Sequence, residues 1–424
     1  MPPQPPLRIG RFHYAWLVAA TTFLVLIIAA GVRSTPGVLM LPIELQMGWS
    51  AQTVSSAAAI NIALFGLIGP FAAALMQTFG VRRTMVLGLL LVSASVATAG
   101  FAREPWQLII TYGIGAGTGL GMLAMVLAAT IANRWFVAQR GVVTGALMAA
   151  TATGQLIFLP VLALAAEHFG WRSATWIVAS AALATIVPVV AFIRDRPSDV
   201  GLLALGATEA SVVPVRGGNP LAIALGSLRR ASSSPSFWIL AGTFFICGAS
   251  TNGLIGTHFI AACGDHGIAE IPAASMLAAM GIFDLIGTTA SGWFSDRLDN
   301  RILLFVYYGL RGLSLLALPF ALDASFGGLW IFAIFYGLDW IATVPPTVRL
   351  ATQAFGTEEG PIVYGWIGAA HQLGAGAIAF GAGSIRTAFA SYTPAFEISG
   401  LLCLGAAFAV LALRAVPRAR VATA

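Results

Sequence analysis

The sequence predicts an all-α membrane protein of twelve transmembrane helices, arranged as two pseudo-symmetric bundles of six. Three observations predict this fold class. The 424 residues are 58% hydrophobic and 9% charged, with a mean hydropathy of +0.88, and a soluble fold of that composition would expose large apolar patches. Apolar runs long enough to cross a bilayer recur along the chain. The two halves of the chain also repeat each other in register.

The apolar runs fall into two groups of six, separated by a polar segment. Each is long enough to cross roughly 30 Å of hydrocarbon as a helix, and much longer than a barrel strand of about ten residues. The expected spans are 14–41, 52–78, 84–101, 107–132, 141–166 and 173–193, followed by 237–262, 272–295, 302–321, 328–349, 361–385 and 394–413. The first run is too long for a signal peptide, so we expect an uncleaved first span.

Arginine placement predicts the orientation, because short cytoplasmic loops retain basic residues. All 22 basic residues are arginine. With both termini inside, the cytoplasmic side collects Arg8, Arg11, Arg82, Arg83, Arg134, Arg140, Arg194, Arg196, Arg216, Arg229, Arg230, Arg297, Arg301, Arg349, Arg414, Arg418 and Arg420, whereas the opposite side collects Arg103, Arg172 and Arg386. We therefore expect a multi-pass protein of a bacterial inner membrane with cytoplasmic termini, and no nucleic-acid partner.

A polar segment divides the chain. Residues 194–236 are rich in Pro, Gly, Ser and charge, which is typical of a linker. The domain organisation predicted is an N-terminal six-helix bundle (1–193), a cytoplasmic linker (194–236) and a C-terminal six-helix bundle (237–424). Within the linker, "PLAIALGSLRR" fits either a short interfacial helix or a loosely ordered stretch.

An internal repeat relates the two bundles. An offset of 219 aligns Gln77 with Asp296 and Arg82 with Arg301, after the second and eighth spans. Two halves in the same orientation and register imply a pseudo-twofold axis along the membrane normal, with a cavity between the halves.

With this repeat, the sequence resembles the major facilitator superfamily over essentially its whole length. The superfamily's loop signature, G-x-x-x-D-R-x-G-R-R, matches "GWFSDRLDNR" at 292–301, with Asp296 and Arg297 in place. The resemblance implies that Asp296, Arg297, Arg301 and Arg82 belong to a gating loop. The first-half copy departs from the signature, since Gln77 and Thr78 replace its Asp-Arg pair.

Two segments look like the monocarboxylate transporter and oxalate/formate antiporter branch of that superfamily. They are "NRWFVAQRGVVTGALMAATATG" at 133–154 and "FGTEEGPIVYGWIGAAHQLGAG" at 355–376. That branch has Asp and Arg four residues apart in the eighth span, whereas here Asp284 is followed by Thr288. The resemblance therefore implies an organic anion as substrate without supplying the second arginine.

Polar residues inside the spans are the candidate site, because charges in a bilayer need a partner or a water-filled cavity. Arg33 is expected to bind an anionic group of the substrate, since guanidinium holds a carboxylate bidentately. The alternative is a snorkelling or internally paired arginine that closes the outer gate. The other predicted substrate-binding residues are Asn61, Gln155, Asn252, His258, Asp339, Trp340 and His371. Asn252 stands at the repeat position of Arg33.

Two acidic residues within spans admit two interpretations. Asp284 and Asp339 either couple transport to protons or form a static ion pair with Arg311 in the ninth span. His258 and His371 are either titratable site groups or hydrogen-bonded packing residues.

The resulting prediction is a secondary transporter that moves a small organic solute by alternating access, most simply an organic anion such as a monocarboxylate, by proton symport or exchange. The alternatives are uptake of a neutral or heteroaromatic nutrient such as a riboflavin-like vitamin, or efflux of a toxic compound. We expect no cofactor, no metal and no enzymatic activity, because the chain has no nucleotide-binding G-x-x-x-x-G-K-[ST] motif and no paired catalytic groups. The expected partners are the substrate, a proton or counter-substrate and the bilayer, around a monomer.

Overall fold

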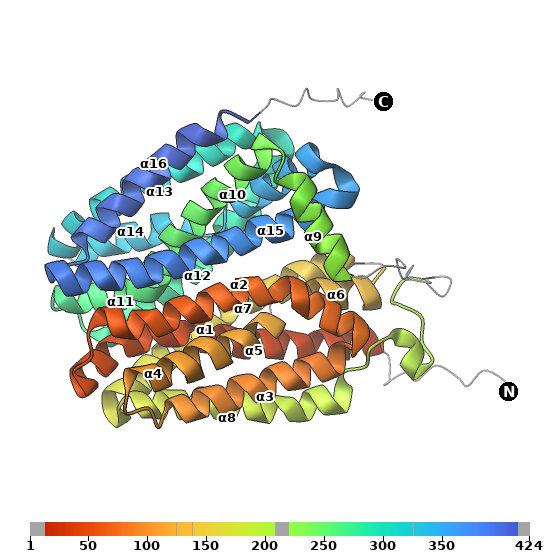
Figure 1. Cartoon of the computed structure of the whole chain (residues 1–424), viewed down its shortest axis with the longest axis horizontal. Helices are drawn as coiled ribbons and strands as arrows, with labels where there is room; N and C mark the ends of the chain where they lie inside the picture. Colours follow the sequence, from red (N-terminus) through yellow and green to blue (C-terminus); the bar gives the residue numbers. More distant parts are fainter. Residues whose placement is uncertain (1–12, 124, 138, 208–219, 325, 414–424) are drawn as a thin grey trace.

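The computed structural model describes residues 13–123, 125–137, 139–207, 220–324 and 326–413. Helices dominate, and they form two bundles that lie side by side in Figure 1. Ten helical stretches of the described chain are long and apolar enough to span a membrane. The other two expected spans correspond to α7, where Thr153–Phe169 is a shorter apolar helix, and to the later part of α15.

The first bundle contains six antiparallel passes. They are α1 (Tyr14–Met47), α2 (Ala51–Thr78), α3 (Val81–Ala99), a composite fourth pass, α7 (Arg140–Phe169) and α8 (Trp171–Phe192). The composite pass consists of α4 (Pro105–Leu108), the π-helix η1 (Ile109–Ala116), α5 (Gly117–Met122) and α6 (Met125–Trp135). The predicted twelve-helix fold class is thus confirmed in this half.

The second bundle repeats the arrangement. Its first pass combines α10 (Pro235–Gly248), the π-helix η3 (Ala249–Ile255) and α11 (Gly256–Asp265). The others are α12 (Glu270–Arg297), α13 (Asn300–Ala324), α14 (Phe326–Asp339), α15 (Val344–Phe389) and α16 (Thr393–Val410). α15 has 46 residues and a non-helical Gly356 (φ 80°, ψ 169°), so it holds the end of the tenth pass and all of the eleventh.

The linker contains one helix, in the segment for which the sequence allowed either a short interfacial helix or a loosely ordered stretch. α9 (Pro220–Ala231) covers the "PLAIALGSLRR" segment, and a 3₁₀ turn, η2, covers Pro197–Val200. α9 contacts both α2 and α15, so it touches both bundles at the end of the molecule that carries the termini. We call this end the termini face and the opposite end the distal face.

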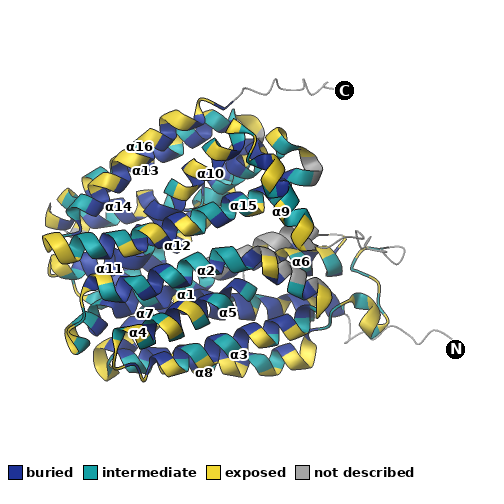
Figure 2. Cartoon of the chain, in the orientation of Figure 1, coloured by how far each residue is buried: buried dark blue, intermediate teal, exposed yellow. Residues whose placement is uncertain are grey.

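Apolar side chains point outward as lipid requires. Large exposed residues such as Leu183 and Val187 on α8, or Leu401 and Phe408 on α16, lie on outer helices. Figure 2 shows exposed residues along α8, α3 and α16, with buried residues on the inner helices. In water this surface would be unfavourable, but a bilayer solvates it.

The bundles meet through α1 with α11, α2 with α15, and α7 with α12. Near the distal face these contacts are close. A Cβ added at Gly37 would lie 2.7 Å from the carbonyl oxygen of Gly256, and one at Gly264 would lie 2.8 Å from Leu41. Toward the termini face, Gly69 on α2 and Gly365 on α15 have no atom of the described residues within 4 Å of such a Cβ. Close contacts between backbone and side chains of the two halves thus occur toward the distal face.

Candidate functional site

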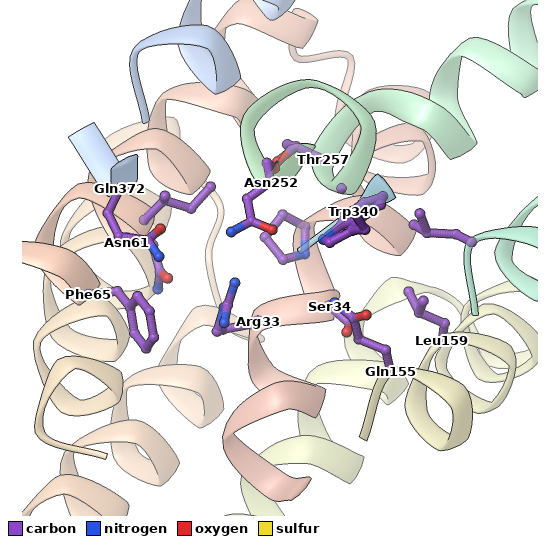
Figure 3. Close-up of a pocket in the computed structure, with 14 residues that line it drawn as sticks. Arg33, Ser34, Asn61, Phe65, Gln155, Leu159, Asn252, Thr257, Trp340 and Gln372 are labelled. Carbon is purple, nitrogen blue, oxygen red and sulfur yellow. Dashed lines mark hydrogen bonds between the residues drawn. The ribbon is translucent and has the colours of Figure 1, made fainter. Parts of the chain in front are cut away.

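A small polar cavity lies between the two bundles, midway along the helices. Its lining comes from α1, α2 and α7 of the first half and from η3, α11, α12, α15 and the α14–α15 turn of the second (Figure 3). The space left for solvent is about 30 Å³, room for a water or two. The lining residues are Arg33, Ser34, Pro36, Asn61, Ile62, Phe65, Gln155, Leu159, Asn252, Gly256, Thr257, Leu277, Trp340 and Gln372.

Among the described residues of this lining, Arg33 is the one with a charged side chain. Its guanidinium carbon lies 4.6 Å from the centroid of the Phe65 ring, a cation–π contact between α1 and α2. Within the described chain Arg33 forms no ion pair with an acidic side chain. The cavity therefore presents a positive charge, stacked on an aromatic face, whose hydrogen-bond donors remain available.

The proline after Arg33 explains how α1 is held at the cavity. Pro36 has no N–H, so the carbonyl of Val32 loses its intrahelical donor. The hydroxyl of Tyr112 on η1 donates to that carbonyl at 2.9 Å. Asn61 on α2 donates from Nδ2 to the Tyr112 carbonyl at 2.8 Å. Its side-chain oxygen forms no further hydrogen bond in the described chain, so Asn61 both braces three helices and faces the cavity.

Asn252 occupies the repeat position of Arg33 and lines the same cavity from the other half. It lies on the π-helix η3, and Thr257 donates to its backbone carbonyl at 2.8 Å. π-Helical turns are frequent at functional sites because they re-aim side chains. The Asn252 amide forms no hydrogen bond within the described chain, so its donors and acceptor are free to meet an occupant.

Gln372 is one of the lining residues that sequence reasoning missed. It lies on α15 where that helix crosses α2 at Gly66, and a Cβ on Gly66 would clash with the Cβ of Gln372. Its Oε1 atom is buried and has no hydrogen-bond partner in the described structure. The sequence feature that could have indicated this crossing is Gly66, because a glycine lets two helices approach closely. Ser34, Phe65 and Thr257 were missed too.

Five of the eight residues predicted to bind substrate line this cavity: Arg33, Asn61, Gln155, Asn252 and Trp340. The other three lie outside its lining. His258 is fully buried and bonded through its ring nitrogens to the Tyr392 hydroxyl (3.2 Å) and the Ala379 carbonyl (2.7 Å). His371 packs against Phe244, with ring centroids 4.7 Å apart.

Asp339 instead pairs with Arg311. Nε of Arg311 lies 2.6 Å from Oδ2 of Asp339, and both residues are buried, 1% and 9% exposed. Asp284 accepts hydrogen bonds from Thr288 (2.8 Å) and from the backbone N–H of Ile341 (2.9 Å). The monocarboxylate transporter branch has an arginine at the position of Thr288. Here the Thr288 hydroxyl donates a hydrogen bond to the Asp284 carboxylate in its place.

The expected gating-loop residues lie at the termini face. Arg297 stacks on Trp293 at 4.0 Å, and Arg301 pairs with Asp299 at 2.7 Å. Arg82 donates its backbone N–H to Asp195. The side chain of Asp296 lies outside the described part of the structure. In the described chain no group of three His, Cys, Asp or Glu side chains is placed to hold a metal.

Two six-helix halves around a shared polar cavity define a polytopic membrane protein. The chain belongs to the Major Facilitator Superfamily, because the model of that family matches residues 22–379. It is accordingly a transporter, and its prediction as a member of that superfamily is confirmed.

Relatives agree with this assignment. The chain is 26% identical over 346 residues to the Uncharacterized MFS-type transporter YcxA of Bacillus subtilis, covering 81% of each protein. It is 25% identical over 405 residues to Monocarboxylate transporter 13 of Bos taurus, covering 94% of this chain and 89% of the relative. A bacterial homologue of the human lysosomal transporter Spinster, in an inward-facing and unoccupied conformation, shares the fold (TM-score 0.72, 15% identity, covering 96% of this chain and 100% of that one).

Proposed function

We propose that this transporter carries a small organic monoanion, most simply a monocarboxylate, whose carboxylate is held by Arg33. The observation that carries the proposal is the charge of the cavity. Arg33 is cationic and has no acidic partner among the described residues, while the other polar groups of the described lining are neutral amides and hydroxyls. A buried charge needs compensation, and one carboxylate supplies it. The positive charge of Arg33 would then be compensated only while a substrate carboxylate is bound.

The amides around Arg33 add selectivity under this proposal. Asn61, Gln155, Asn252 and Gln372 come from both halves, so an occupant bridges them. Sites built to hydrogen-bond a substrate reject analogues that leave buried polar groups unpaired. The relatives named as monocarboxylate transporters support the anion, and their low identity leaves the particular acid to experiment.

Transport would proceed by rocking the halves about this cavity, driven by proton symport or by exchange. The close packing at the distal face and the open glycines toward the termini face support an inward-facing state, if the termini are cytoplasmic as the arginine distribution predicts. We place the protein in a bacterial inner membrane as a monomer, with bundles at 1–193 and 237–424 and a linker at 194–236. The end of α8 at Phe192 and the start of α10 at Pro235 support that division.

A second candidate is a neutral or heteroaromatic solute, such as a riboflavin-like nutrient or an exported toxic compound. Phe65 and Trp340 favour it, since both put aromatic faces at the cavity. Proteoliposomes with an imposed pH gradient separate the candidates. We expect uptake from a labelled panel of lactate, pyruvate, oxalate, aromatic acids and riboflavin to be confined to monoanions and lost in Arg33→Ala. Uptake of riboflavin alone, indifferent to Arg33, would favour the second candidate.

A further inference from the structure

The tenth pass is broken beside the cavity, between the end of α14 at Asp339 and the start of α15 at Val344. The break follows from the sequence. Pro345 and Pro346 lack N–H groups, so the carbonyls of Ile341 and Ala342 lose the donors that a continuous helix would supply. Backbone groups freed within a membrane must be satisfied by the protein.

Hydrogen bonds within the turn and one from a serine satisfy some of the backbone groups at this break. The N–H of Val344 bonds to the Ile341 carbonyl at 2.8 Å, and the N–H of Trp340 takes the Gly337 carbonyl at 3.1 Å. The hydroxyl of Ser291 on α12 donates to the Ala342 carbonyl. The N–H of Ile341 forms its hydrogen bond outside this pass, with a side chain of α12.

Two buried charged side chains bond to further backbone groups at the break. Asp284 on α12 accepts the Ile341 N–H at 2.9 Å. Arg311 on α13 donates from one nitrogen, Nη2, to the carbonyls of both Asp339 and Trp340, while its Nε holds the Asp339 carboxylate. A planar fork of fixed donors suits this triple contact, and an ammonium group would not reproduce it.

Trp340 is the residue that this arrangement places. It follows α14 directly, lies in the cavity lining, and packs edge-on against Tyr336 with ring centroids 5.7 Å apart. Its own carbonyl is bound by Arg311, and the next N–H is bound by Asp284. Both charges therefore act on the backbone that carries the Trp340 ring.

We infer that Arg311 and Asp284 are positioning residues that hold the break before Pro345 and thereby fix Trp340 in the cavity wall. Asp284 serves as a hydrogen-bond acceptor throughout the transport cycle and does not carry a proton across the membrane. The charged groups near it are Arg311 and Asp339, which are already paired with each other. Asp339 thus forms the static ion pair with Arg311 that was one of the two interpretations. Asp284 instead accepts hydrogen bonds from Thr288 and Ile341 and forms no ion pair within the described chain.

Two substitutions at one position separate the roles. Asp284→Asn keeps an oxygen acceptor for the Ile341 N–H and removes the carboxyl proton site, whereas Asp284→Leu removes both at similar volume. Hydrogen–deuterium exchange of peptides spanning 338–346, in nanodiscs, reads the break directly. We expect wild-type exchange in Asp284→Asn and at least tenfold faster exchange in Asp284→Leu. Arg311→Lys, which keeps the charge, should raise exchange in the same peptides.

Uptake against external pH gives the second readout. Asp284→Asn should keep the wild-type pH profile and KM, and Asp284→Leu should raise KM about tenfold. Loss of gradient-driven uptake or an altered pH profile in Asp284→Asn would overturn the inference, as would equal exchange in both variants. If the wild type takes up no anion, the proposed function fails, while the exchange measurement still decides the role of Asp284.

Discussion

The guanidinium of Arg33 lies 4.6 Å over the ring of Phe65, and this contact joins α1 to α2 at the wall of the central cavity. The ring holds the cation without using its N–H donors, which an acidic partner would occupy. Arg33 is thus held in place and remains able to bind an anion.

Phe65 should therefore tune affinity through Arg33. We expect Phe65→Leu to raise the KM for the transported anion by roughly two- to thirtyfold, because a cation–π contact is worth about 0.5–2 kcal/mol. Phe65→Tyr keeps the aromatic face and should stay near wild type. Initial uptake rates across substrate concentrations measure both, and equal KM values for the Leu and Tyr variants would contradict the role assigned to the ring.

Gly66 should be required for the close approach of α2 and α15. A methyl group at this position would clash with Gln372, so Gly66→Ala should lower the maximal transport rate severalfold. Gly69→Ala is a matched control one turn away, because an added Cβ there meets no atom of the described residues within 4 Å. The account of this crossing is wrong if the two alanine variants transport alike.

Gln372 should contribute to binding at a cost in stability. Its buried Oε1 has no partner in the described structure, and such an unpaired acceptor costs about 1–3 kcal/mol. Gln372→Met should keep or raise the thermal unfolding midpoint while raising the substrate KM. A lower unfolding midpoint in this variant would show that the amide has a partner in the unoccupied protein.

The distal face should open during each transport cycle. Leu41 on α1 lies against Gly264 on α11, across the two halves. A disulfide between Leu41→Cys and Gly264→Cys should form readily under mild oxidation and stop uptake, with recovery on reduction. Each single variant is the control. Undiminished uptake by the crosslinked protein would exclude alternating closure at this face.

Sequence reasoning found the architecture because lipid imposes long apolar runs, and the offset of 219 correctly paired Arg33 with Asn252 around one cavity. It found polar lining residues less completely. In helices that are apolar on every side, periodicity does not reveal which face meets the cavity. Gln372 depends on a glycine in a helix of the other half, and Phe65 gains its role only from the arginine that it touches.

The buried charges illustrate a different limit. The sequence placed Asp284, Asp339 and Arg311 within spans and offered two interpretations. Our inference of a positioning role rests on hydrogen bonds at the α14–α15 break, and no spacing rule predicts those bonds across α12, α13 and α14. His258 was likewise a candidate by type, yet its ring bonds to Tyr392 and Ala379, away from the cavity lining.

Uptake of a labelled monocarboxylate by proteoliposomes containing wild type, Arg33→Lys or Arg33→Gln tests the central claim most directly. Hydrogen bonds to charged groups are worth about 1.5–3 kcal/mol, so the glutamine variant should lose roughly ten- to hundredfold in kcat/KM. The lysine variant should fall between, because it keeps the charge and loses the bidentate fork. Wild-type uptake in Arg33→Gln would contradict the claim that this arginine binds the anion.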